Sequence, residues 1–124
     1  MRVLIVDDVP ANRLVAAGIL KKRGHNVMAV ANGREALARL EQEDFDVVLM
    51  DLLMPVMGGV EATRIIRDPA SLVRRHDVPV IAVTAFAEGD GKRDCMEAGM
   101  NGYLSLPLRR DALIQTVEQY DAGA

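Results

Sequence analysis

The sequence predicts an α/β fold in which helices cover both faces of a parallel sheet. Short apolar runs rich in Val, Leu and Ile, such as Val3–Val6 and Val47–Met50, alternate five times with amphipathic stretches. Runs of this kind are typical of strands that are buried on both faces. Alternating βα units of this length lead to a parallel sheet with right-handed crossovers.

The expected strands are four or five residues long, and each ends near a polar or turn-forming residue. They cover Arg2–Val6, Val27–Ala31, Val47–Met50, Val80–Val83 and Gly102–Ser105. Asn32-Gly33 turns the chain after the second strand, and Leu106-Pro107 breaks the fifth. Residues of these types favour turns, so the apolar runs are separate strands.

The expected helices follow the strands and carry apolar residues at helical spacing. They cover Pro10–Arg23, Glu35–Glu41, Val60–Arg67, Lys92–Ala98 and Arg110–Tyr120. In the first helix the residues at this spacing, which we expect to form its buried face, are Ala11, Leu14, Val15, Gly18 and Ile19.

Size and composition indicate one small globular domain, residues 1–124, without repeats or linkers. The net charge of −3 and the dispersed basic residues argue against binding to nucleic acid or an anionic membrane. No apolar stretch approaches the roughly 20 residues that span a bilayer, and the N-terminus lacks the pattern of a signal peptide. The single cysteine, Cys95, excludes an internal disulfide, so we expect a reducing compartment, the cytoplasm.

Acidic residues follow two of the expected strands. Asp7 and Asp8 come directly after the first strand, and Asp51 comes directly after the third. The carboxyl ends of parallel strands meet at one edge of a sheet, where open α/β sheets bind their ligands. Three carboxylates in one crevice repel each other, and their oxygen atoms favour a hard cation, with Mg²⁺ the leading candidate. Either both Asp7 and Asp8 reach the cation, one of them through water, or only one does.

Asp51 is also a candidate nucleophile, because a carboxylate beside bound Mg²⁺ can attack phosphorus. Thr84, at the end of the fourth strand, offers a hydroxyl group to a phosphoryl oxygen, and Ala85 is small enough to leave room above the carboxylate. A single aspartate after a strand is often only a turn former. The set of three aspartates with Thr84 favours phosphoryl transfer instead.

Four segments resemble the receiver domains of two-component response regulators. They are VLIVDDVPANR, VVLMDLLMPVMGGVEATR, VPVIAVTAFA and EAGMNGYLSLPL, and together they extend over essentially the whole chain. The resemblance implies a flavodoxin-like, doubly wound (βα)5 fold with a five-stranded parallel sheet of order 2-1-3-4-5. Asn12-Arg13 and the segment Glu61–Arg64 look most like receivers attached to hybrid sensor kinases.

The resemblance also implies a phosphorylation site. Asp51 would accept a phosphoryl group from a histidine kinase or a histidine phosphotransfer protein. Asp7, Asp8, Asp51 and the backbone carbonyl of Leu53 would hold Mg²⁺ (or Mn²⁺). Leu53 and Phe86 would flank the phosphoryl group, and neither can orient an attacking water. The chain would catalyse only its own aspartyl phosphorylation and dephosphorylation.

Two switch residues follow from the same resemblance. Thr84 and Tyr103 would report phosphorylation to the face formed by the fourth helix, the fifth strand and the fifth helix. A homodimer partner or an effector would bind this face. The family also carries a cis peptide bond at the position of Leu106-Pro107.

One position departs from the family pattern. Leu106 stands where receivers carry a lysine, immediately before the proline that follows the fifth strand. Leucine removes a cation where charge develops during transfer and where the phosphoryl group is held. Its neutral side chain can also desolvate the carboxylates and raise their pKa values. We therefore expect stronger dependence on divalent cation and less complete switching. Arg109 and Arg110 are expected on the last helix or at its start, not in the place of the lysine.

Three other functions are alternatives to a working receiver. A degenerate receiver would be a phosphorylation-independent interaction module; Leu106 favours this reading, whereas the intact acidic residues and Thr84 argue against it. An aspartyl phosphatase generally needs a second acid two residues after the nucleophile, where Leu53 stands. A flavodoxin-like cofactor binder is disfavoured because Asp7-Asp8 would repel a phosphate.

Overall fold

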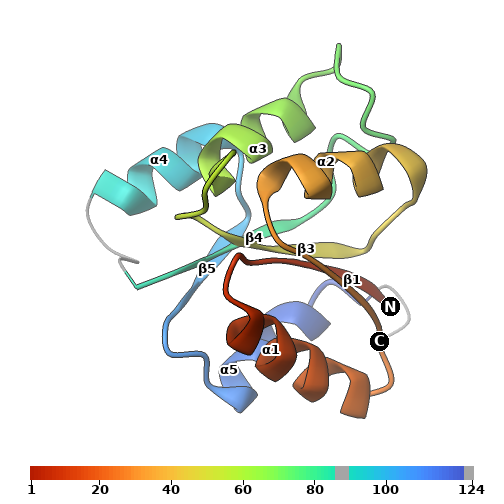
Figure 1. The fold of residues 1–124 in the computed structure, drawn as a ribbon, viewed down its shortest axis with the longest axis vertical. Helices are drawn as coiled ribbons and strands as arrows, with labels where there is room; N and C mark the ends of the chain where they lie inside the picture. The colour runs from red at the N-terminus through yellow and green to blue at the C-terminus, as the bar shows by residue number, and fades with distance from the viewer. Residues whose placement is uncertain (86–89, 122–124) are drawn as a thin grey trace.

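In the computed structural model of the chain, which describes residues 1–85 and 90–121, helices cover both faces of a five-stranded parallel sheet (Figure 1). The strands, in the spatial order β2-β1-β3-β4-β5, are β1 (Arg2–Val6), β2 (Asn26–Val30), β3 (Val47–Asp51), β4 (Val80–Thr84) and β5 (Gly102–Ser105). The helices are α1 (Pro10–Lys22), α2 (Gly33–Gln42), α3 (Gly59–Arg67), α4 (Asp90–Ala98) and α5 (Arg110–Glu118). Helices α1 and α5 lie on one face, and α2, α3 and α4 lie on the other. The predicted fold class and strand order are confirmed.

The ends of β1 and β5 coincide with the expected ends, and the ends of the other elements lie within two residues of them. Strand β3 includes Asp51, which pairs in register with Val83 of β4. Helix α2 begins at Gly33 because the Asn32 side chain caps it and accepts a hydrogen bond from the Glu35 N–H at 3.0 Å. Helix α5 ends at Glu118, before the expected Tyr120. The apolar pattern locates the interior of each element, whereas local capping decides where it ends.

The core consists of two layers, one on each face of the sheet. Adjacent residues of β3 point to opposite faces, so that Met50 joins the layer under α2, α3 and α4, while Leu49 joins the layer under α1 and α5. Strands β1, β3 and β4 are almost fully buried between these layers. Their carboxyl ends therefore emerge from a closely packed interior at defined positions.

The predicted buried face of α1 was wrong. Ala16 and Leu20 are the residues of α1 that are fully buried, whereas Leu14 is 75% exposed and Val15 is 53% exposed. Ala11 and Gly18 are exposed as well, and Ile19 is half-buried. Apolar residues occur on two sides of this helix, and the spacing alone does not say which side faces the sheet. Two large apolar side chains consequently lie on the surface, in the half of α1 that follows Asp8.

The described helices are short. The longest of them, α1, has 13 residues. Across residues 1–85 and 90–121, no helix combines the length and the apolar character that crossing a bilayer requires.

Candidate functional site

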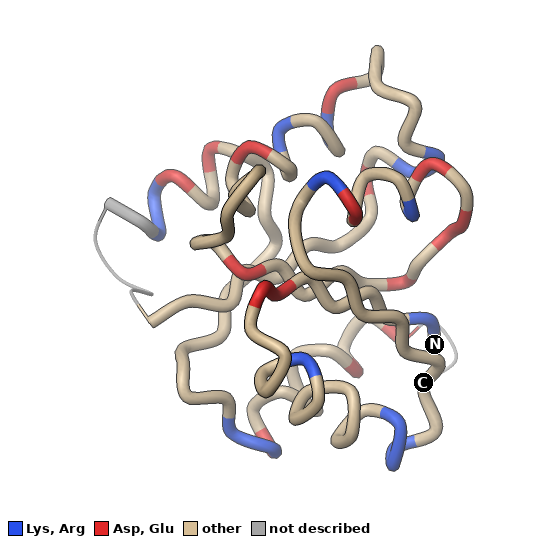
Figure 2. Tube along the Cα trace, viewed as in Figure 1, with Lys and Arg blue, Asp and Glu red and all other residues tan. Residues whose placement is uncertain are grey.

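The structure brings the carboxylates of Asp7, Asp8 and Asp51 together at the carboxyl edge of the sheet. One oxygen atom from each of the three lies within 4.8 Å of the others. This proximity arises because β1 and β3 are neighbouring strands. Val6 pairs with Met50, so Asp7 and Asp51, the next residues, lie side by side at the edge of the sheet. The acidic segments at the ends of these two strands adjoin each other in Figure 2. Asp7 is buried, with 5% exposed, and the other two aspartates are half-buried.

Local backbone groups orient two of these carboxylates. The Val9 N–H donates to Asp7 Oδ1 at 2.9 Å, and the Leu53 N–H donates to Asp51 Oδ1 at 3.3 Å. Each aspartate therefore forms the side-chain turn that is common after a strand. The turn engages one oxygen of each carboxylate and leaves the other oxygen for a ligand. Turn formation and ligand binding are thus compatible at Asp7 and Asp51.

Burial, together with the neighbouring carboxylates, raises the pKa of Asp51 to about 6, from an ordinary value of 3.8. The largest cause is burial, followed by the negative charge of Asp7 and then smaller effects of Asp8; the Leu53 N–H acts in the opposite direction. A cation placed among the three carboxylates would relieve this repulsion. The donor set contains only oxygen, which fits a hard divalent ion.

Thr84 and Leu106 lie at the ends of the two neighbouring strands β4 and β5. Thr84 is buried, with 5% exposed, and its carbonyl oxygen accepts a hydrogen bond from the Leu106 N–H at 2.9 Å. The Leu106-Pro107 peptide bond is cis, as expected. The half-buried Leu106 side chain packs against the core layer under α1 and α5. The end of β5 therefore presents an uncharged, half-buried side chain beside the strand that carries Thr84.

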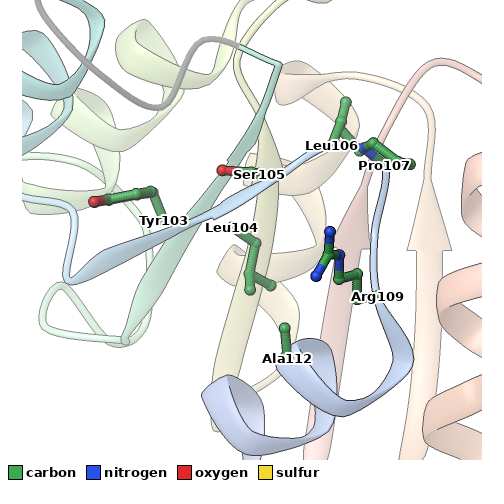
Figure 3. A pocket seen from close by; sticks show the side chains of 7 residues that line it. All are labelled: Tyr103, Leu104, Ser105, Leu106, Pro107, Arg109 and Ala112. Atoms are coloured by element: carbon green, nitrogen blue, oxygen red, sulfur yellow. The ribbon is translucent and has the colours of Figure 1, made fainter.

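A separate cleft of about 300 Å³ lies between β5 and α5 (Figure 3). Its lining residues are Tyr103, Leu104, Ser105, Leu106, Pro107, Arg109 and Ala112. None of the three clustered aspartates lines it. The Arg109 side chain projects between β5 and α5 in this view. Tyr103 is 39% exposed, and the Lys92 ammonium group lies 5.1 Å from the centre of its ring. Tyr103 is thus a surface aromatic on β5, in contact with α4.

Exposed apolar side chains occur on both segments that lead away from the acidic cluster. They are Val9, Leu14 and Val15 on the α1 side and Leu53 and Val56 on the loop between β3 and α3. Val56 has a backbone φ of 70°, which is strained for a β-branched residue and costs about 1–2 kcal/mol. The sequence pattern does not predict this surface, because helical spacing places Leu14 and Val15 on the expected buried face of α1.

Arg13 also lies at this site, although it is not among the site residues predicted from the sequence. Its guanidinium Nη1 donates to the backbone carbonyl of Asp7 at 2.7 Å, which brings a positive charge to the edge of the acidic cluster. A signal was present in the sequence, since a basic residue lies in the first turns of the helix that directly follows two aspartates. Phe86, expected beside the phosphoryl group, lies outside the described residues.

A family model described as the response regulator receiver domain matches residues 3–118 of the chain. The sensor protein GacS of Pseudomonas syringae pv. syringae is 41% identical over 116 residues. The histidine-protein kinase BarA of Escherichia coli strain K12 is 36% identical over 124 residues. The chain is covered to 94% and 100% in these matches but spans only 13% of the length of either curated relative.

Solved structures show the same fold. The receiver domain of the sensor histidine kinase PA1611 from Pseudomonas aeruginosa PAO1, solved with a magnesium ion coordinated in its active site cleft, superposes with a TM-score of 0.85 at 36% identity. The match covers 96% of this chain and 95% of that one. The chemotaxis protein CheY4 of Vibrio cholerae superposes with a TM-score of 0.87 at 30% identity, covering 96% and 97% of the two chains.

Proposed function

Because the chain belongs to the response regulator receiver domain family, we propose that it accepts a phosphoryl group on Asp51 from a histidine kinase or a histidine phosphotransfer protein. The observation that supports this function best is the convergence of Asp7, Asp8 and Asp51 within 4.8 Å at the end of the sheet. Thr84 ends the neighbouring strand, β4. Identity to two sensor kinases over nearly the whole chain supports a donor that carries a phosphohistidine.

We assign a Mg²⁺ (or Mn²⁺) site to Asp7, Asp8 and Asp51, together with the backbone carbonyl of Leu53. The all-oxygen donor set and the magnesium ion in the PA1611 receiver support this assignment. When bound, the ion would offset the carboxylate charge and polarise the transferred phosphoryl group. Asp7 would hold its ligand oxygen in place through the bond that its other oxygen accepts from the Val9 N–H.

In the proposed transfer, a carboxylate oxygen of Asp51 forms a bond to phosphorus while the bond from phosphorus to the donor nitrogen breaks. The donor nitrogen keeps the electron pair of the broken bond and takes a proton, and Asp51 becomes an acyl phosphate. The nucleophile must be ionised, and a pKa of about 6 leaves Asp51 mostly ionised at neutral pH. The Thr84 hydroxyl would donate a hydrogen bond to a phosphoryl oxygen.

Leu106 leaves this site short of positive charge. Three ionised aspartates and one divalent cation retain one excess negative charge, and phosphorylation adds more because a phosphoryl group carries nearly two. A lysine at position 106 would offset one of these charges. We propose that the chain depends more strongly on divalent cation, and switches less completely, than a receiver with that lysine.

The proposed function predicts a covalent adduct on Asp51. Treating the protein with a small acyl phosphate in the presence of Mg²⁺ is expected to add the mass of one phosphoryl group, measured on the intact protein. The adduct should be stable in acid, labile to hydroxylamine, and absent after chelation of the metal. Asp51→Asn should carry no adduct, whereas Asp111→Asn, which changes an exposed carboxylate on α5, should behave like the unaltered protein.

The alternative function is a degenerate receiver that binds its partner without phosphorylation, and Leu106 is the observation that favours it. The same experiment separates the two functions. If no adduct forms with either an acyl phosphate or a phosphorylated histidine donor, at any Mg²⁺ concentration, the phosphoacceptor function is wrong.

A second prediction concerns Leu106. We expect Leu106→Lys to increase the rate of phosphorylation by an acyl phosphate several-fold, because it places a cation where negative charge develops. The variant should also lose a smaller fraction of its rate when Mg²⁺ is removed, because the lysine supplies part of the positive charge that the ion would supply. Leu106→Met, which keeps the side chain neutral and similar in size, is the matched control and should leave both quantities unchanged. Equal rates and equal Mg²⁺ dependence in the lysine variant would refute this reading of Leu106.

We propose two separate partner surfaces. The phosphodonor would dock on the exposed apolar side chains that flank the acidic cluster, including Leu14, Val15 and Val56. A homodimer partner or an effector would bind the face formed by α4, β5 and α5, where Tyr103 is the switch residue and where the cleft of Figure 3 opens. We place these events in the cytoplasm, in residues 1–124 acting as one receiver unit.

A further inference from the structure

We propose that Arg13 supplies positive charge to the phosphorylation site and so takes over part of the role that a lysine at position 106 would have. This inference rests on the proposed function of Asp51. It goes beyond that function because it assigns the charge balance of the site to a residue of α1. Arg13 is proposed to act through the electrostatic potential at the carboxylates and the phosphoryl group, without binding the metal.

The position of Arg13 follows from one short hydrogen bond. Its Nη1 donates to the carbonyl oxygen of Asp7 at 2.7 Å, and its side chain is partly buried. That carbonyl and the Asp7 carboxylate belong to the same residue. The guanidinium is therefore separated from the Asp7 carboxylate by less than the Debye length, which is about 10 Å at 0.1 M salt. The carboxylate oxygens of Asp8 and Asp51 lie within 4.8 Å of an Asp7 oxygen. The charge of Arg13 therefore lies nearest to Asp7, the most buried of the three acids, whose carboxylate adjoins the other two.

Arg13 bonds to the backbone carbonyl of Asp7, which leaves the carboxylate oxygens of the proposed metal site free. A guanidinium that paired directly with Asp7 or Asp51 would compete with a cation for the carboxylate oxygens. Across residues 1–85 and 90–121, Arg13 forms no ion pair with any of the three clustered aspartates. Its guanidinium carries five N–H donors, and the bond to Asp7 uses only Nη1.

The location on α1 supports a functional reason for the charge. Arg13 lies in the first turns of this helix, whose N-terminus already carries partial positive charge, so a cation there is unfavourable for the helix alone. The first turn contains no acidic residue that would offset it, and the other basic residues of α1, Lys21 and Lys22, lie at the favourable end. The clustered aspartates are the negative groups that make the position of Arg13 favourable.

Basic residues near the other edge of the site have different partners. Arg109 projects between β5 and α5, Arg110 pairs with Asp111 at 3.7 Å, and Lys92 lies over the ring of Tyr103. Leu106 itself packs toward the core layer under α1 and α5. In the described part of the chain, Arg13 is the basic side chain that hydrogen-bonds to one of the clustered aspartates.

The test compares Arg13→Gln with the unaltered protein in two measurements whose expected changes have opposite signs. Glutamine keeps an N–H donor for the Asp7 carbonyl but removes the charge. Mg²⁺ affinity, measured calorimetrically without any phosphodonor, should increase roughly threefold to tenfold, because a cation that repels Mg²⁺ is gone. The rate of phosphorylation by an acyl phosphate at saturating Mg²⁺ should decrease by a similar factor.

Three further variants sharpen the comparison. Arg13→Lys should restore both quantities, because it restores the charge. Lys21→Gln, which removes one positive charge from the far end of the same helix, should change neither. In a Leu106→Lys background, Arg13→Gln should reduce the phosphorylation rate much less, because the lysine already supplies the charge.

The opposite changes in Mg²⁺ affinity and phosphorylation rate distinguish an electrostatic role of Arg13 from a purely structural one. If Arg13→Gln weakens both Mg²⁺ binding and phosphorylation, Arg13 only holds the start of α1 in place, and the proposal is wrong. It is equally wrong if Mg²⁺ affinity does not change or if the lysine background leaves the defect undiminished. Failure of the proposed function is distinct, because the unaltered protein would then form no adduct at all, while the Mg²⁺ titration would still show whether Arg13 acts on the acidic cluster.

Discussion

The Asp51→Asn variant is expected to be more stable than the unaltered protein at pH 7–8 when divalent cations are absent. Folding raises the pKa of Asp51 from 3.8 to about 6, because the carboxylate is buried next to Asp7 and Asp8. The folded state therefore binds this proton more tightly than the unfolded chain. The associated stability is fully present below pH 4 and is lost as the pH rises through 6.

Asparagine cannot ionise, so the variant keeps this stability at every pH. The full pKa difference corresponds to roughly 3 kcal/mol, and because Asp51 is only half-buried, solvent screening reduces the expected gain to about 1–2 kcal/mol. Urea unfolding between pH 3 and pH 8 in the presence of a chelator measures it. The difference between the two proteins should vanish below about pH 4.

Added Mg²⁺ should narrow this difference, because it stabilises the unaltered protein by binding to the folded state and binds more weakly to a site that has lost one carboxylate. Asp111→Asn is the control, because this carboxylate is exposed and lies away from the cluster. An Asp51→Asn protein that is no more stable than the unaltered one at pH 8 would show that the three carboxylates do not repel each other as the geometry indicates.

The second large effect is expected at Gly59, the first residue of α3. A Cβ atom added there would overlap the carbonyl oxygen of Asp51 and would lie 2.9 Å from Cγ of Met50. These atoms belong to the end of β3, which is held in the middle of the sheet and cannot move freely. We expect Gly59→Ala to reduce the free energy of unfolding by about 1–3 kcal/mol, the usual range for overpacking in a closely packed interior.

Gly59→Ala should also slow the proposed phosphorylation more than its loss of stability explains, because the clash falls on the backbone of Asp51, the proposed phosphoacceptor. Gly18→Ala is the matched control. A Cβ at this exposed position of α1 meets no atom within 4 Å, so alanine should stabilise the helix by about 0.5–1 kcal/mol. Equal stabilities of the two alanine variants would contradict the close packing of α3 against β3.

Both expected effects, at Asp51 and at Gly59, involve the end of β3, where the strand emerges from the core. Asp51 is the last residue of a strand whose other four residues are buried. That position holds the carboxylate rigidly and removes part of its hydration, which raises its pKa and places it beside Asp7. The same close packing leaves no room for a side chain on Gly59. The rigid placement and partial burial of Asp51, on which its proposed role depends, are therefore expected to lower the stability of the protein when the site holds no cation.

Much of this arrangement was predictable from the sequence because the relevant signals are local. Apolar runs of four or five residues identified the strands, and the polar residues directly after them located Asp7, Asp8, Asp51 and Thr84 at one edge. The buried face of α1 was not predictable from spacing, because Leu14 and Val15 follow the helical period as well as Ala16 and Leu20 do. Which of these pairs is buried depends on how the helix crosses the sheet.

The sequence by itself determined the parallel α/β class and the acidic edge of the sheet, because burial on both faces of a strand requires continuous apolar runs and the next polar residue marks their end. Only the tertiary structure decided that the three carboxylates converge within 4.8 Å and that Arg13 bonds to the Asp7 carbonyl. It also decided that Leu106 is half-buried and packs against the core layer under α1 and α5. These features depend on strand register and helix orientation, which are set by packing between residues far apart in the chain.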